Sequence, residues 1–138
     1  MPFSTEYLPD GRGVHLTGTG LLTGQEILDA KAGLLRSPDR LKGLACGLVD
    51  VTDVTELRIT RDDVLEFVAV DVRIAALVPR AVAVAVVAPG DLAFGLARMW
   101  EAFAEVTGWT THVFRSRAEA EAWLRPWVEG RLPDAPRS

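Results

Sequence analysis

Two continuous apolar runs do most to limit what this chain can fold into. Residues 44–51 (LACGLVDV) and 81–88 (AVAVAVVA) consist almost entirely of Leu, Val and small apolar residues. Neither run shows the alternation of apolar and polar residues that marks a strand with one exposed face. Such runs are typical of parallel strands that helices cover on both faces. We therefore expect both segments to be central strands of an α/β fold.

The segments around these runs predict further strands and helices. Pro9-Asp10-Gly11-Arg12-Gly13 has the turn chemistry of a hairpin, and Thr23-Glu26, Thr60-Asp63 and Ser116-Glu119 have the spacing of capping boxes at helix starts. The expected strands cover residues 3–8, 14–19, 44–51, 81–88 and 109–114. The expected helices cover residues 24–35, 61–77, 91–107 and 117 to about 126, where a proline kinks or ends the last one.

The resulting order is β-β-α-β-α-β-α-β-α in a single domain. Strands that alternate with helices predict a mixed, mainly parallel five-stranded sheet with four helices on its faces, in which the first hairpin strand is antiparallel. We assign the domain to residues 1–128. Residues 129–138 contain Gly and Pro but few large apolar side chains, and they are expected to form a flexible tail.

Composition excludes several classes of function. The 138 residues carry a net charge of -4, and acidic and basic residues are interspersed, which disfavours binding to nucleic acid. The single cysteine, Cys46, lies in an apolar run and is interpreted as a small buried side chain. Because the chain also has no signal-like N-terminus and no apolar stretch long enough to span a membrane, we expect a soluble cytoplasmic protein.

The expected helix over residues 61–77 carries more apolar surface than one face of a sheet can cover. After its first turn, only Glu66, Asp71 and Arg73 interrupt the apolar residues. A helix on a sheet needs an apolar arc of roughly 100°. The surplus must contact another helix, a second subunit or an apolar ligand. We expect a homodimer formed through this helix.

A short segment after the first central strand resembles a known family. Asp50, followed by Val-Thr-Asp-Val-Thr-Glu-Leu at residues 51–57, resembles the Asp-Leu-Ser-x-Val-x-x-Ile segment of STAS domains, the fold of anti-sigma-factor antagonists. The later segments VAVVAPGD (residues 84–91) and Phe-Arg-Ser-x-x-Glu-Ala-x-x-Trp-Leu (residues 114–124) are more similar to the SpoIIAA-like group of small bacterial proteins. That group is related both to STAS domains and to CRAL-TRIO lipid-binding domains. The resemblance implies the same fold along nearly the whole chain.

The phosphorylation switch of STAS proteins is absent in its usual form. In those proteins a serine at a helix start is phosphorylated and controls the binding of a partner kinase. Here Ile59 occupies the matching position and has no hydroxyl group. Thr60 is the only neighbour with a hydroxyl, and its role as a helix cap already explains it. Whether Thr60 is phosphorylated is left open.

The candidate ligand-binding or partner-binding residues come from two places. The carboxyl edge of a parallel sheet is where ligands usually bind, and polar residues at strand ends or helix starts are expected near it. Each of these polar residues also has a simpler interpretation as a turn or cap. The candidates at this edge are Asp50, Thr52, Asp53, Thr60 and Asp91. The apolar candidates on the helix over residues 61–77 are Phe67, Val70 and Ile74.

The sequence lacks the common signatures of catalysis. We find no paired histidines or cysteines for a metal, no nucleophile elbow and no phosphate-binding glycine loop. We therefore expect a non-enzymatic regulatory or binding domain without a cofactor or metal, which binds a protein partner or a small apolar ligand. The alternatives are a small enzyme that uses Asp50, Asp53 or His15, and a purely oligomeric structural role.

Overall fold

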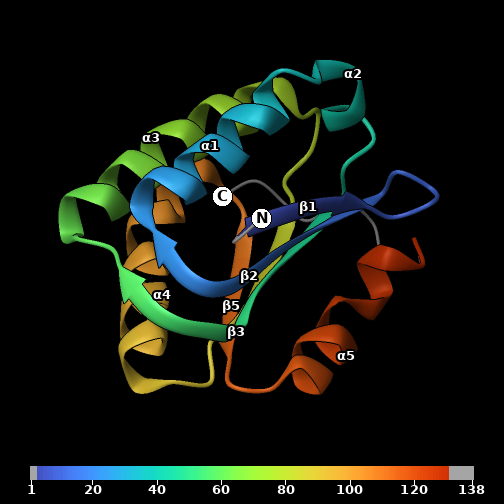
Figure 1. Ribbon diagram of the computed structural model, residues 1–138. Helices are drawn as coiled ribbons and strands as arrows, with labels where there is room; N and C mark the ends of the chain where they lie inside the picture. Colours follow the sequence, from blue (N-terminus) through green and yellow to red (C-terminus); the bar gives the residue numbers. More distant parts are fainter. Residues whose placement is uncertain (1–2, 131–138) are drawn as a thin grey trace.

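The computed structural model describes residues 3–130, and its five strands form one sheet in the order β1-β2-β3-β4-β5. Most of the expected tail, residues 131–138, lies outside the described residues. Strand β1 pairs with β2 in the antiparallel direction, and the other neighbours are parallel. This arrangement confirms the expected mixed, mainly parallel sheet (Figure 1). The strands are β1 (Phe3–Tyr7), β2 (Gly13–Thr23), β3 (Cys46–Arg58), β4 (Ala83–Val87) and β5 (Thr110–Phe114).

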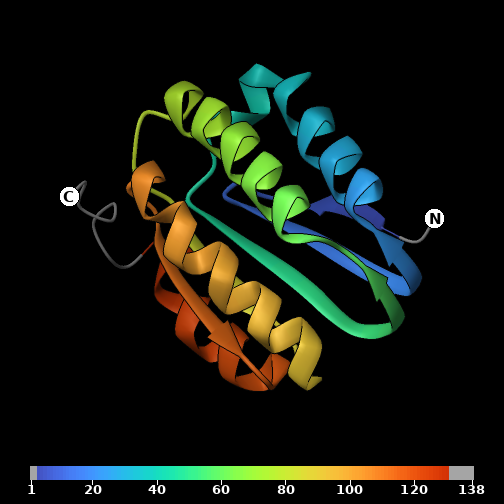
Figure 2. The same cartoon turned by 90° about the vertical axis from the view of Figure 1, so that its left-hand side faces the viewer.

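Helices cover both faces of the sheet, but unequally. The helices α1, α3 and α4 lie side by side over one face (Figure 2), whereas α5 packs against β3, β4 and β5 on the other face. The helices are α1 (Gly24–Leu35), α2 (Pro38–Leu41), α3 (Arg61–Leu77), α4 (Asp91–Phe103) and α5 (Arg117–Val128). The four long helices are those expected from the sequence.

Two short helical segments were not expected. Ser37-Pro38 was interpreted as the end of a helix, but Pro38 is also the first residue of the one-turn helix α2, a position that proline tolerates because its nitrogen needs no partner there. Helix α4 ends at Phe103, and the chain continues as a 3-10 turn, η1 (Ala104–Thr107), up to Gly108. The φ of Gly108 is 77°, a conformation that glycine adopts without strain.

Strands β2 and β3 extend well beyond the expected ends at residues 19 and 51. They pair with each other as far as Thr23 and Arg58, whereas β4 pairs with β3 only up to Asp50. The extension leaves its polar side chains exposed, so its sequence lacks the apolar pattern of a central strand. The pairing also shifts register twice, between Thr17 and Thr19 and between Gly20 and Leu21, and the φ of Gly20 is 63°.

The capping boxes fix the starts of α1 and α3. The amide of Glu26 donates to Thr23 Oγ1 over 3.3 Å and the Thr23 amide donates to Glu26 Oε1 over 3.1 Å. Thr60 and Asp63 make the same reciprocal pair, over 3.1 and 2.8 Å. At the start of α5 the Ser116 hydroxyl accepts from the amide of Glu119. These hydrogen bonds explain why the starts of all three helices agree with the sequence.

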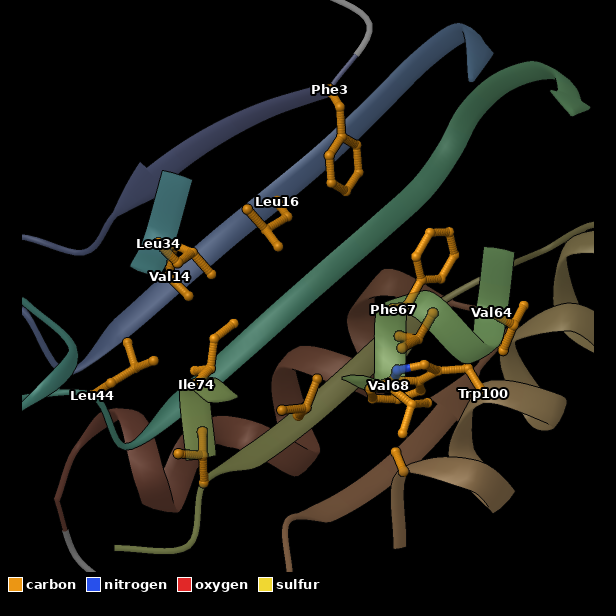
Figure 3. Packing of buried hydrophobic residues seen from close by; sticks show 14 of the residues in the cluster. Phe3, Val14, Leu16, Leu34, Leu44, Val64, Phe67, Val68, Ile74 and Trp100 are labelled. Carbon is orange, nitrogen blue, oxygen red and sulfur yellow. The ribbon is translucent and has the colours of Figure 1, made fainter. Parts of the chain in front are cut away.

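The apolar core has two parts, one on each face of the sheet. The larger part lies between the sheet and the helices α1, α3 and α4, and Figure 3 shows Phe3, Leu16 and Phe67 within this layer. The smaller part lies under α5 and includes Leu48, Leu124 and Cys46. Cys46 is buried as expected, and burial raises the pKa of its thiol to about 11. The thiol is therefore protonated at neutral pH.

Candidate functional site

A cavity of about 140 Å³ lies between α3 and the sheet. Helix α3 packs sideways against α1 and α4, while its backbone lies farther from the strands. The side chains of α3 that face inward do not fill the space beneath it. The helix therefore forms the roof of the cavity, and β2, β3 and β4 form its floor.

The walls of the cavity are almost entirely apolar. Leu16, Val49 and Val86 lie on the floor, and Val64, Phe67 and Ile74 descend from α3. The expected binding residues Phe67 and Ile74 are therefore brought together at this site. Val70, the third apolar candidate, is partly buried against the core but does not line the cavity.

Some residues that line the cavity are partly exposed, and we take four of them as its entrance. The lining residues Val51, Leu57, Ile59 and Leu96 are only partly buried, and they lie on β3, directly before α3 and on α4. Ile59, which occupies the place of the phosphorylated serine of STAS proteins, is thus part of an apolar entrance.

A buried ion pair interrupts the apolar roof. Lys31 Nζ on α1 donates to Asp71 Oδ1 on α3 over 2.6 Å, and the indole Nε1 of Trp100 on α4 donates to Asp71 Oδ2 over 2.8 Å. Asp71 is 0% exposed and Lys31 is 9% exposed. All three residues line the cavity. One carboxylate thus joins the three helices above the sheet.

Sequence reasoning missed this cluster, although a signal was present. In the sequence, Asp71 stands among the residues that interrupt the apolar surface of its helix. Helical spacing places it on the same face as Val64, Phe67 and Ile74, which the structure shows to be the buried face. A carboxylate at such a position needs a buried partner. The same reasoning applies to Lys31, a charged residue that lies between Ile27 and Leu34 on the inner, apolar face of α1.

Asp50 lies on the opposite face of the sheet from the cavity. The residue is 6% exposed, and its carboxylate accepts from the amide and the hydroxyl of Thr52 and from Arg117 Nη1 over 3.0 Å. Burial by itself would raise the pKa of Asp50, but the hydrogen bonds from Thr52 and Arg117 outweigh it, so the pKa lies below its usual value. The structure therefore brings Asp50 and Thr52 together as an anchor for the first turn of α5.

The other polar candidates at this edge lie apart from one another. A register shift separates Asp50 from Asp53, and Asp53 is exposed on β3. Thr60 is the exposed cap of α3. Asp91 is exposed at the start of α4, where it pairs with Arg115 over 2.8 Å. These side chains serve separate turns, caps and surface pairs, the simpler interpretation that the sequence also offered for them, and their binding of a ligand or partner stays a prediction.

Two further observations bear on the class of protein. None of the helices within residues 3–130 is both long and apolar enough to cross a membrane. In the same part of the chain, no three His, Cys, Asp or Glu side chains are grouped as they would be to hold a metal ion.

Comparison with known proteins identifies the fold. No protein-family model matches the chain, and no curated protein matches it. Among solved structures, it is similar to an uncharacterized protein of the DUF3478 family with a SpoIIAA-like fold from Shewanella loihica PV-4, with a TM-score of 0.55. The similarity covers 88% of this chain and 91% of that one at 20% sequence identity. The chain therefore has a SpoIIAA-like fold, as the resemblance of its sequence implied.

Proposed function

We propose that this protein is a non-enzymatic binding protein that holds a small apolar ligand in the cavity beneath α3. The observation that carries the proposal is the cavity itself, whose lining is almost entirely apolar and includes partly exposed residues on β3, directly before α3 and on α4. An unfilled apolar space costs stability, because the side chains around it lose packing contacts. A bound apolar molecule would restore those contacts.

The volume of the cavity sets the size of the ligand. An engineered apolar cavity of about 150 Å³ in another protein stays dry and binds benzene. The cavity here, at about 140 Å³, has room for a molecule of similar size. A single ring with a short substituent, or a short branched chain, is therefore a better fit than a long lipid chain.

The experiment that tests this proposal is a titration with ethylbenzene, followed by the amide chemical shifts of the protein. We expect saturable shifts in residues that line the cavity, such as Phe67, Val49 and Leu96. The Ala97→Leu variant fills part of the cavity and should abolish binding. The matched control, Ala102→Leu, changes an exposed alanine of the same helix and should leave binding intact.

Two results would overturn the proposal. One is the absence of saturable binding to the wild type, and the other is equal binding by the Ala97→Leu variant. Native mass spectrometry of the purified protein adds an independent readout, because a retained ligand appears as a discrete mass increment that denaturation removes.

The outer face of α3 supports a second part of the proposal, which is self-association. Its inner and lateral faces contact the cavity, α1 and α4, and these faces bury Val64, Phe67, Val68 and Ile74. Leu65 and Val72, which lie seven residues apart and so share this outer face, nevertheless remain 40% and 43% exposed. We expect a homodimer through this face. Light scattering that shows a monomer at tens of micromolar protein would contradict it, without affecting the cavity proposal.

A further inference from the structure

The ion pair of Lys31 and Asp71 is a polar feature of the cavity whose hydrogen-bonding capacity is only partly used, and the buried indole Nε1 of Trp109, another lining residue, has no hydrogen-bond partner among the described residues. Among the described residues that line the cavity, Lys31 and Asp71 are the only charged ones. An ammonium group has three N–H donors. Within the described part of the chain, Asp71 Oδ1 is the only acceptor bonded to Lys31 Nζ, and the Trp100 ring centroid lies 5.7 Å away. Lys31 therefore has spare donors in a place that solvent barely reaches.

Asp71 has spare capacity as well. Each carboxylate oxygen can accept more than one hydrogen bond. Oδ1 accepts from Lys31 and Oδ2 accepts from Trp100, so one direction at each oxygen is left. The pair can thus both donate to a ligand atom and accept from it. A hydroxyl group satisfies both partners, and a carbonyl oxygen satisfies the donor.

The ion pair has no net charge, and this favours an uncharged ligand. Lys31 and Asp71 neutralise each other at 2.6 Å. A ligand with a carboxylate would add an uncompensated negative charge beside Asp71, in a space where the other walls are apolar and charges are poorly solvated. A pure hydrocarbon would leave the spare donors of Lys31 without acceptors. An uncharged oxygen avoids both costs.

The position of the pair determines the orientation of the ligand. Asp71 lies roughly 15 Å along α3 from its first residue, since each helical residue adds about 1.5 Å. The partly exposed entrance residues Leu57 and Ile59 come shortly before the start of α3 in the chain. The polar group of a ligand would therefore point inward, and its apolar part would lie toward the entrance.

We propose that the natural ligand is a small uncharged molecule with a single hydroxyl or carbonyl oxygen, which binds with that oxygen at Lys31 and Asp71. This inference deepens the proposed function and depends on it. Three probes of similar shape separate the possibilities: ethylbenzene, which has no oxygen; benzyl alcohol, which replaces the terminal methyl group with a hydroxyl; and benzoate, which carries a charge.

The test compares the wild type with the Lys31→Met/Asp71→Asn double variant, in which the ion pair is removed without leaving a lone charge. Isothermal titration should show benzyl alcohol bound about tenfold more weakly by the variant, since it loses a hydrogen bond to a charged group. Ethylbenzene should bind the variant at least as tightly as the wild type. Benzoate should bind the wild type more weakly than benzyl alcohol does.

A second measurement needs no variant. In the wild type, nuclear Overhauser contacts should join the benzyl alcohol methylene to the ε-methylene of Lys31. Three results would each overturn this inference while leaving the cavity proposal intact. The double variant could lose equal affinity for benzyl alcohol and ethylbenzene, or the benzyl alcohol methylene could contact only entrance residues. The third result is that the wild type binds benzoate more tightly than benzyl alcohol. If none of the three probes binds the wild type, both proposals fail.

Discussion

The ion pair beneath α3 makes a strong prediction about stability. In the Lys31→Met variant, Asp71 keeps the Trp100 indole as its partner but loses the only positive charge bonded to it within the described residues. Asp71 is 0% exposed and the cavity that it lines is otherwise almost entirely apolar, so water that enters the cavity is a poor replacement for the ammonium group. Removing one member of a buried pair costs about 3 to 5 kcal/mol. A protein of this size has a total stability of about 5 to 15 kcal/mol, so the variant should be marginal.

The double variant Lys31→Met/Asp71→Asn should recover most of that loss. It buries no charge, and the side-chain oxygen of the introduced asparagine can still accept from Trp100 Nε1. Replacing both members of a buried pair is often neutral or stabilising, so we expect a free energy of unfolding within about 1 kcal/mol of the wild type. The two substitutions should therefore be strongly non-additive.

Urea unfolding followed by circular dichroism and tryptophan fluorescence measures these differences. The matched control is Lys42→Met, which removes the only other lysine. Lys42 is exposed and pairs with the exposed Asp39 at 3.7 Å, so the control should leave the unfolding midpoint unchanged. A loss below about 1 kcal/mol for Lys31→Met, or a double variant as unstable as that single variant, would refute the reasoning.

Two further predictions concern the anchor of α5 and the start of α1. Hydrogen bonds hold the pKa of Asp50 below its ordinary value of 3.8, so its contribution to stability is present above that pH and is lost as the pH falls through the folded-state pKa. Arg117→Met removes one of those bonds and should flatten the acid side of the stability profile below about pH 4; an unchanged slope would contradict this. Gly24→Ala places a Cβ atom 2.5 Å from the Asp63 carboxylate and should lower the unfolding free energy by about 1 kcal/mol through the disturbed cap of α3. Gly95→Ala, where nothing lies within 4 Å, should instead raise it by about 0.5 to 1 kcal/mol, and equal effects at the two glycines would count against a steric cause.

Local signals in the sequence account for most of the fold. Capping boxes at Thr23 and Thr60 define the starts of α1 and α3, because their hydrogen bonds involve residues only three positions apart. The apolar runs define the central strands, because a strand that is covered on both faces needs apolar residues along its whole length. The extension of β3 to Arg58 was not predicted, since it depends on pairing with β2 beyond the reach of β4 and leaves polar residues exposed.

The site was harder to predict because its contacts join distant segments. Asp71 lies 40 residues from Lys31 and 29 residues from Trp100, and Arg117 lies 67 residues from Asp50. Helical periodicity indicates that Asp71 faces inward, but not which cation reaches it. Nor does periodicity give the distance between a helix and the sheet beneath it. That distance, which creates the cavity, depends on how α1 and α4 hold α3 from both sides.

The support of α3 by its neighbouring helices has a consequence for how such a protein can change its selectivity. The neighbouring helices α1 and α4 hold α3 in place from its sides. A substitution that shortens Phe67 or Ile74 therefore enlarges the cavity without removing a contact that fixes the backbone of the sheet. Replacing Ala93 or Ala97 with a larger residue narrows the cavity from the side of α4. Substitutions on α3 and α4 can therefore adapt the same fold to ligands of different sizes, while the strands of the sheet remain unchanged.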